Sequence, residues 1–245
     1  PEKTGTVSNT DRTVQMGRQA LQPPGDAKPD LWIVQQIAQR MGLDWHYTGE
    51  HAGVASVYEE MRQAMAGAIA GISWQRLESH SSVTYPCLSE DDPGQPIVFH
   101  DHFPTSDGRV KLMPAGLIPA NEQPDADYPL VLITGRQLEH WHTGAMTRRA
   151  TVLDAIEPAP TVSVCGTELQ RWGLQAGNRV RVNSRRGAVE LTVRRDDGTP
   201  PGVLYMPFAY REAAANLLTN AALDPFGKIP EFKYCAVRIE LLATA

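Results

Sequence analysis

The second half of this chain carries six short runs of apolar and β-branched residues, and this pattern restricts the fold more than any other feature. The runs are Leu130–Thr134, Thr161–Val164, Arg179–Asn183, Ala188–Val193, Val203–Met206 and Ala236–Leu241. Each has the length of a strand, and many short strands in close succession are typical of a small barrel. We therefore predict a β-barrel after Tyr128.

Two connections within this region have their own signals. Residues 168–172 followed by Gly173 predict a short helix, because glycine commonly follows a helix end. Arg185, Arg186 and Gly187 stand between two predicted strands, and this arrangement predicts a hairpin turn.

The first half predicts helices. Leu31, Val34, Ile37, Ala38 and Met41 recur at helical steps, which predicts a helix over 30–41 with Asp30 as its cap and an apolar stripe that packs on a neighbour. A second helix is expected to begin at Ser56, which has capping-box spacing to Glu59, and to break over 67–71. The glycine pair at the two ends of that break lies in too short an apolar stretch to be a membrane dimer motif.

Little other regular structure is expected before the barrel. The polar opening from Thr4 to Arg18 predicts a loop with at most one short strand. Residues 97–99 and 110–113 predict a pair of brief strands, and residues 119–129 predict a linker. We place two domains at 1–124 and 125–245.

Composition narrows the function. The net charge of -5 and the mixing of both signs along the chain argue against nucleic-acid binding. Cys87, Cys165 and Cys235 lie far apart, which argues against an iron–sulfur or zinc site in this segment, and their odd number fits a reducing compartment. No apolar run approaches the roughly 20 residues of a membrane helix. We expect a cytoplasmic protein, and the start at Pro1 without Met suggests a longer parent.

The richest polar segment follows the first predicted barrel strand. Thr134 and Gly135 allow a close backbone approach to an anion, and Arg136 offers a planar set of donors, so this start suits a phosphate. If residues 139–142 are extended, His140 and His142 share one face, which suits a heteroaromatic ring. A zinc site with a missing third ligand and an ordinary surface loop remain alternatives.

A second pair of histidines carries less information. His100 and His102 flank Asp101 in a proline-rich segment, with no further ligand at a useful spacing. We therefore assign no metal ligand in this chain.

The polar segment resembles a known signature. Residues 134–136, 140–144 and 146–149 are similar to the molybdopterin-dinucleotide-binding domain of the dimethyl-sulfoxide-reductase family, and the similarity continues over 173–187 and 232–238. Residues 1–20 resemble the segment that precedes this domain in formate dehydrogenases. The resemblance implies a six-stranded double-psi β-barrel preceded by an α/β part of the molybdopterin oxidoreductase region.

The resemblance also implies a set of cofactor-binding residues. They come from one continuous loop and three later positions: Leu132, Ile133, Thr134, Gly135, Arg136, Gln137, Leu138, Glu139, His140, Trp141, His142, Thr143, Phe208, Asn216 and Lys233. The implied cofactor is bis-molybdopterin guanine dinucleotide with molybdenum or tungsten. The metal-bound residue and the acid–base residues of that family lie upstream of such a segment, so no catalytic residue is nominated.

The implied function is the carboxy-terminal part of a formate dehydrogenase catalytic subunit. Such an enzyme oxidises formate to carbon dioxide and passes electrons through iron–sulfur clusters of the missing part and of iron–sulfur or flavin subunits, with NAD as the expected acceptor. This segment alone is expected to be inactive. A molybdopterin nitrate reductase is one alternative, and a free-standing double-psi barrel that acts as a binding module is an alternative of another class.

Overall fold

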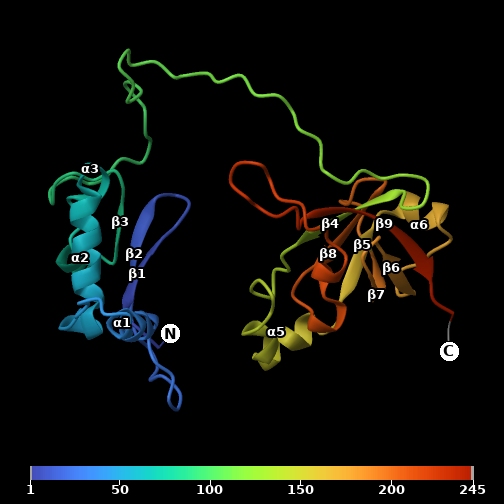
Figure 1. The fold of residues 1–245 in the computed structure, drawn as a ribbon, viewed down its shortest axis with the longest axis horizontal. Helices are drawn as coiled ribbons and strands as arrows, with labels where there is room; N and C mark the ends of the chain where they lie inside the picture. The colour runs from blue at the N-terminus through green and yellow to red at the C-terminus, as the bar shows by residue number, and fades with distance from the viewer. Residues whose placement is uncertain (1, 244–245) are drawn as a thin grey trace. The chain divides into compact units, whose positions relative to one another are not determined.

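The computed structural model describes residues 2–243 and divides the chain into two compact units, Pro1–Pro114 and Ala115–Ala245 (Figure 1). The second unit is a closed β-barrel. Its strands are β4 (Leu130–Gly135), β5 (Thr161–Val164), β6 (Arg179–Asn183), β7 (Ala188–Arg195), β8 (Val203–Pro207) and β9 (Tyr234–Leu241). The expected six-stranded double-psi barrel is therefore confirmed, and each predicted run is found as a strand.

The strands are not paired in chain order. The barrel closes in the order β4-β8-β5-β7-β6-β9, with parallel pairs β4–β8 and β5–β7. The last strand, β9, runs antiparallel to both β4 and β6 and so completes the ring. Every strand consequently has a hydrogen-bonded neighbour on both sides, which removes the exposed edges of an open sheet.

Alternation along the strands fills the barrel. Val180 and Val182 of β6 are fully buried while Arg179 and Arg181 are exposed, as the alternating pattern predicts. Leu132 of β4 lies beside Leu204 of β8, and neither side chain is exposed to solvent. Burial of a side chain of this size stabilises the fold by roughly 1.5–3 kcal/mol, so the interior is the main source of stability of this unit.

The expected helix and turn between these strands are confirmed. Helix α6 spans Gly166–Arg171 and is followed by Gly173 at φ 63°. The β6–β7 hairpin turns through a hydrogen bond from the Ser184 amide to the Gly187 carbonyl, at 2.9 Å. A second helix, α5 (Thr151–Ile156), and three short 3-10 helices, η2 (Thr147–Arg149), η3 (Arg211–Ala213) and η4 (Ala215–Leu217), complete this unit.

The segment before the barrel has no helix or strand over 119–129, as expected for a linker, but it is anchored to the barrel. The Glu122 carboxylate forms ion pairs with Arg185 and Arg186 of the β6–β7 turn, and Arg185 also contacts Asp125. Burial alone would raise the pKa of Glu122, but the hydrogen bonds from the two guanidinium groups outweigh it and lower that pKa below its ordinary value of 4.5.

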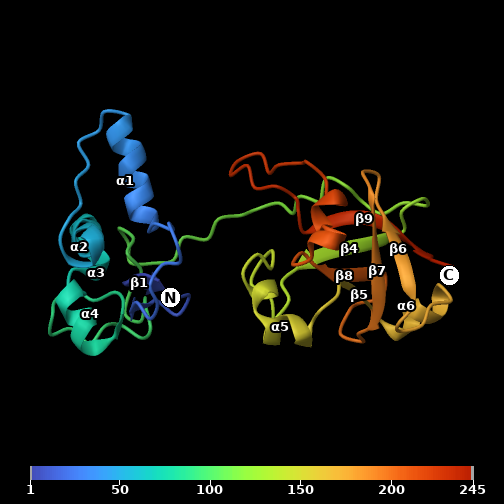
Figure 2. The same ribbon diagram turned by 90° about the horizontal axis from the view of Figure 1, so that it is seen from below.

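The first unit is a small α/β fold. Its strands β1 (Gly5–Ser8), β2 (Thr13–Gly17) and β3 (Ser82–Thr84) form an antiparallel sheet in chain order. The helical segments of this unit are α1 (Asp30–Arg40), η1 (Glu50–Gly53), α2 (Val54–Ala64), α3 (Ala66–Ile69) and α4 (Trp74–His80). Figure 2 labels α1 to α4, of which α2 contacts β1 and α4 contacts β2 and β3. The prediction of a loop with at most one short strand over 4–18 is thus wrong. It is a hairpin because Val14 and Met16 are buried in a core with Trp74 and Leu77.

Helix α1 differs from its expected packing. Pro29 is the N-cap, without a side-chain bond, and Asp30 pairs with Lys3 instead. Val34 and Ile37 of the expected inward stripe are 47% and 55% exposed, whereas Gln35 is buried. Gln35 faces inward because its side chain exchanges hydrogen bonds with the backbone of Tyr47, at 2.6 and 3.2 Å.

Helix α2 begins at Val54, two residues before the predicted start. The expected capping box is absent, because the Glu59 carboxylate accepts from the Trp74 amide at 2.7 Å and pairs with Arg62 at 2.6 Å. Residues 66–69 are helical, whereas a break was expected over 67–71. Gly71 does end that turn, since a Cβ there would lie 2.0 Å from the Ser89 carbonyl oxygen.

The two brief strands expected over 97–99 and 110–113 are also wrong, since the structure has neither of them. A strand needs a hydrogen-bonded neighbour, and no described segment supplies one there. All three cysteines are free and buried. Within residues 2–243 no helix is both long and apolar enough to cross a bilayer.

Candidate functional site

The expected cofactor loop begins inside the barrel wall. Leu132 and Thr134 point into the barrel and are buried, while Ile133 and Gly135 are half-buried. The Thr134 hydroxyl donates to the Phe232 carbonyl at 2.7 Å, so this hydroxyl already has a protein partner. Of the expected set, these four residues therefore supply the backbone from which the loop leaves.

Gly135 has a steric role at this point. A Cβ here would lie 2.5 Å from the Tyr205 hydroxyl, which donates a hydrogen bond to the Arg136 carbonyl. The Gly135 carbonyl also accepts from the Phe208 amide, at 3.1 Å. Glycine therefore lets the end of β4 and the segment after β8 approach each other closely.

The loop then turns back on itself, so the extended conformation expected over 139–142 is wrong. Gln137 and His140 form an isolated β-bridge, and Leu138 at the turn is 94% exposed. The side-chain amide of Gln137 donates a hydrogen bond to the Glu139 carboxylate, at 2.8 Å. His142 has φ 48°, a left-handed conformation that is uncommon outside glycine.

The turn separates the two histidines that were expected to share a face. His140 is 2% exposed, and its Nε2 lies 2.8 Å from the Glu157 carbonyl oxygen. Trp141 is largely exposed and its ring lies 4.6 Å from that of His142, edge to face. His142 in turn lies 6.4 Å from the Phe208 ring. Only the second histidine therefore joins an aromatic wall.

That wall belongs to a cavity of about 380 Å³. Its lining residues come from the loop, from the segment after β8 and from the segment before β9: His142, Thr143, Phe208, Tyr210, Arg211, Ala214, Ala215, Asn216 and Phe232. Four of these, His142, Thr143, Phe208 and Asn216, were expected from the sequence. The structure thus brings together residues that lie up to 90 positions apart in the chain (232 − 142).

Five lining residues were missed from the sequence, and three of them carry an aromatic or charged side chain. Tyr210 follows Phe208 by two positions, and this spacing after a barrel strand could have indicated a second ring on the same side. Phe232 directly precedes Lys233, which was expected, and their side chains lie 5.6 Å apart from ammonium to ring centre. Arg211 had no distinguishing sequence signal.

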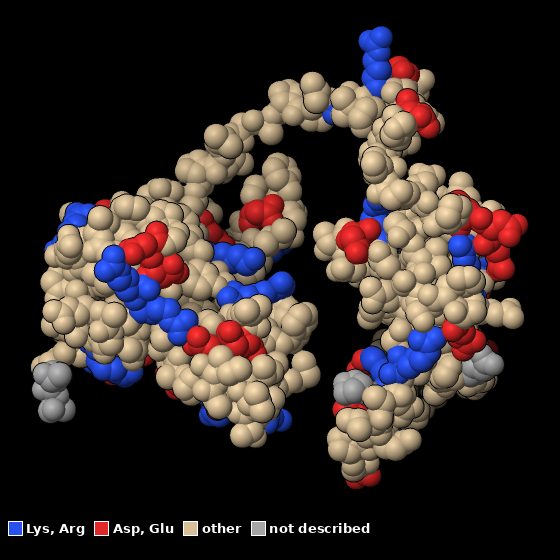
Figure 3. Space-filling model, turned by 180° about the vertical axis from the view of Figure 1, so that it is seen from behind, with Lys and Arg blue, Asp and Glu red and all other residues tan. Residues whose placement is uncertain are grey.

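Positively charged side chains lie in or near the wall of this cavity. Arg211 lines it, and Arg136 lies 3.5 Å from His142, which also lines it. Together with Lys233, these side chains have no carboxylate partner among the described residues, whereas Arg148 and Arg194 do. On the face drawn in Figure 3, several Lys and Arg residues lie beside Asp and Glu residues. Unpaired guanidinium and ammonium groups beside aromatic rings suit a flat ligand that carries anionic groups.

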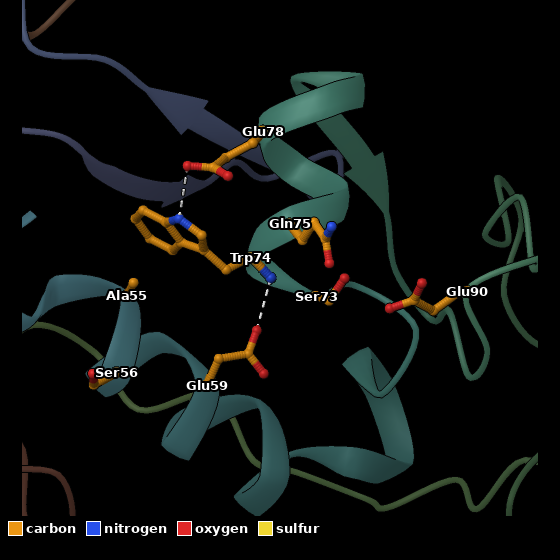
Figure 4. Close-up of a pocket in the computed structure, with 8 residues that line it drawn as sticks. All are labelled: Ala55, Ser56, Glu59, Ser73, Trp74, Gln75, Glu78 and Glu90. Carbon is orange, nitrogen blue, oxygen red and sulfur yellow. Dashed lines mark hydrogen bonds between the residues drawn. The ribbon is translucent and has the colours of Figure 1, made fainter. Parts of the chain in front are cut away.

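A second cavity, in the first unit, has different chemistry. It has a volume of about 660 Å³ and is lined by α2, α4 and nearby residues, with three glutamates among them (Figure 4). Glu59 accepts from the Trp74 amide, and Glu78 accepts from the Trp74 indole at 3.1 Å. Glu59 therefore links α2 to α4, whereas the Glu78 hydrogen bond lies within α4. The described residues contain no group of three His, Cys, Asp or Glu that could hold a metal.

Each of the two units contains a match to a known protein family. The family description "Molydopterin dinucleotide binding domain" matches residues 130–236, and "Molybdopterin oxidoreductase" matches residues 1–40. The chain belongs to the molybdopterin oxidoreductase family. The first match contains the strands β4 to β8, the start of β9 and every residue that lines the 380 Å³ cavity.

Individual relatives match over almost the entire chain. The F420-dependent formate dehydrogenase subunit alpha of Methanocaldococcus jannaschii is 38% identical over 98% of this chain. A periplasmic nitrate reductase of Desulfovibrio desulfuricans is 31% identical over 97%. The chain spans only 35% and 34% of the length of these two relatives.

A solved structure shows the same fold. Acetylene hydratase from Pelobacter acetylenicus matches 97% of this chain and 36% of its own, with a TM-score of 0.68 and 18% sequence identity. The folds of this chain are therefore also found in that solved structure.

Proposed function

We propose that residues 125–245 form a domain that binds molybdopterin guanine dinucleotide, and that residues 1–124 belong to the preceding part of a formate dehydrogenase catalytic subunit. The observation that carries this proposal is the cavity that unites His142, Thr143, Phe208 and Asn216. Its rings can pack on a flat heterocycle, and the Asn216 amide can both donate and accept. The unpaired Arg136, Arg211 and Lys233 can neutralise phosphate.

Bound in this way, the cofactor would supply the redox-active metal, molybdenum or tungsten, that accepts two electrons from formate. This chain's own residues would hold and orient the dinucleotide. We further propose that iron–sulfur clusters elsewhere in the parent and in iron–sulfur or flavin subunits carry the electrons onward in the cytoplasm, and that the chain alone has no activity.

The electron acceptor is a separate question. NAD is the acceptor proposed from the sequence, and the relative from Methanocaldococcus jannaschii, whose name carries F420, motivates a test of that deazaflavin beside NAD. The purified parent enzyme, mixed with formate and each acceptor in turn, should reduce one of them, as followed by the absorbance of the acceptor.

The binding proposal is tested by mass spectrometry of the intact parent, which should release a guanine-dinucleotide pterin. Absence of that compound would contradict it. The choice of reaction is tested with viologen dye, which formate should reduce. Oxidation of reduced dye by nitrate would instead favour a nitrate reductase, the alternative that the 31% identical relative supports.

A further inference from the structure

His140 is expected to be among the strongest polar contacts to the cofactor, but its ring is almost completely buried. Its Nε2 lies 2.8 Å from the Glu157 carbonyl oxygen, and a carbonyl oxygen only accepts. Nε2 therefore carries the proton and donates. The other ring nitrogen, Nδ1, is buried without a hydrogen-bond partner in the described part of the chain.

The same carbonyl accepts a second hydrogen bond. The Tyr210 hydroxyl donates to Glu157 at 3.0 Å, so both lone pairs of the carbonyl oxygen are used. Burial raises the pKa of the Tyr210 hydroxyl, which keeps it protonated and able to donate. The rings of His140 and Tyr210 meet edge to face, 5.6 Å apart. Two side chains that are 70 positions apart (210 − 140) are thus fixed to one backbone atom.

Tyr210 is also held from another direction. The Arg148 guanidinium lies 4.9 Å from the Tyr210 ring centre and donates to Asp154 at 2.9 Å and to Glu212 at 2.6 Å. Arg148 is therefore neutralised within the protein, unlike Arg136. Because Tyr210 lines the cavity, these contacts fix one part of its wall.

The loop after His140 needs such support. A left-handed backbone at a residue with a side chain is strained, so the surrounding contacts must impose it on His142. Next to it, the Trp141 amide donates to the Thr147 hydroxyl, and the Gly144 amide donates to the Trp141 carbonyl, both at 2.9 Å. His140 is the buried end of this short anchored segment.

We propose that His140, together with Tyr210, is a positioning residue: it holds His142 and Thr143 in the cavity wall through the Glu157 carbonyl and does not itself contact the bound dinucleotide. The proposal rests on the binding function inferred above, because it concerns the same cavity. It assigns His140 a role in the protein interior and leaves direct contact to the residues that line the cavity.

Three substitutions separate the parts of this arrangement. His140→Phe keeps a ring of similar size but removes the donor, and His140→Gln can retain a donor near the position of Nε2. Tyr210→Phe removes only the hydroxyl. His100→Phe is the matched control, because His100 is an exposed residue of the other unit whose ring pairs with Asp101.

Backbone hydrogen exchange of the 245-residue chain reports the positioning directly. The Trp141 and Gly144 amides should exchange about tenfold faster in His140→Phe and Tyr210→Phe, since each variant loses about one hydrogen bond. His140→Gln should restore most of the protection, and His100→Phe should change nothing. In the original chain, nitrogen chemical shifts of the His140 ring should report a proton on Nε2 alone.

Binding is measured by calorimetry with GDP as the probe. The dissociation constant should rise about tenfold in His140→Phe and be restored by His140→Gln. Weaker GDP binding with unchanged exchange would mean that His140 contacts the ligand, which overturns the proposal, as would exchange that is unaffected in every variant. If the original chain does not bind GDP, the binding function is contradicted, while the exchange measurements still decide the positioning role.

Discussion

Every strand of the barrel has a partner on both sides, whereas the sheet of the first unit ends on two edge strands, β1 and β3. Apolar side chains differ in the same way. The inward-facing Leu132 of β4 and Leu204 of β8 are completely buried. Trp32, Val34 and Ile37 of α1 are between 45% and 55% exposed. The barrel region contains its own packing partners, so its sequence pattern is sufficient to define it. The apolar side chains of α1 would need a packing partner to become buried, and the described residues of its own unit do not provide one.

The largest effect should come from the barrel interior. Leu204→Ala removes a completely buried side chain and should lower the free energy of unfolding by about 3 kcal/mol, as measured by urea denaturation of the chain. Leu138→Ala is the matched control, since Leu138 is 94% exposed, and it should change that free energy by less than about 0.5 kcal/mol. Equal effects of the two would mean that the barrel core is not the main source of stability.

A smaller effect should follow from crowding beside the cavity. Gly144 has φ 72°, and a Cβ there would lie 2.6 Å from the Ala209 carbonyl oxygen. Gly144→Ala should therefore cost roughly 3 kcal/mol or less, the sum of backbone strain and a steric clash. Gly173 has a similar φ of 63° and open space around it, so Gly173→Ala should cost only about 1 kcal/mol of strain. Thermal unfolding that ranks Gly173→Ala as the worse variant would contradict the local packing.

The anchored linker predicts an acid-sensitive contribution. The pKa of Glu122 is lowered in the folded state, so its ion pairs stabilise the barrel fully above the ordinary value of 4.5, and this stabilisation is lost as the pH falls through the lowered pKa. Glu122→Gln should cost about 1 kcal/mol at pH 7 and less at pH 3. Asp127→Asn, at an exposed neighbouring carboxylate, should show no such difference when unfolding is followed at both pH values. A cost of Glu122→Gln that is equal at both pH values would argue against these ion pairs.

The smallest effect on stability is expected on the exposed face of α1. Ile37→Gln should change the free energy of unfolding by less than about 0.5 kcal/mol, because the side chain is already 55% in water. It should nevertheless reduce the fluorescence of a dye that binds exposed apolar surface. A large loss of stability would show that Ile37 is packed against something and would remove the contrast with the barrel.

The sequence predicted all six barrel strands because each alternates or is wholly apolar, and these patterns need only the barrel itself to satisfy them. The bend of the chain at His140 could not be predicted from a local sequence pattern. It depends on a carbonyl 17 positions later in the chain, and no local spacing reports that contact. The strand predicted over residues 110–113 was wrong for another reason. Their composition favours a strand, but a strand also needs a neighbouring strand, which composition does not provide.

The candidate site was predicted in part. Phe208 and Asn216 could be assigned only through family resemblance, since either residue taken alone is common in cores and turns. Tyr210 and Arg211 lie between them and were missed. The four come together because the segment after β8 folds back through η3 and η4 beside the loop, an arrangement that belongs to the tertiary structure.

The place of β9 in the ring has a consequence for synthesis. This strand pairs with both β4 and β6, and it is the last of the six barrel strands to be synthesised. Until Tyr234–Leu241 has been made, β4 and β6 each lack one neighbour, and the growing chain is an open sheet with two unpaired edges. Such an intermediate is prone to aggregate, so translation of the final strand, rather than of the cavity residues, determines when this domain becomes safe from self-association.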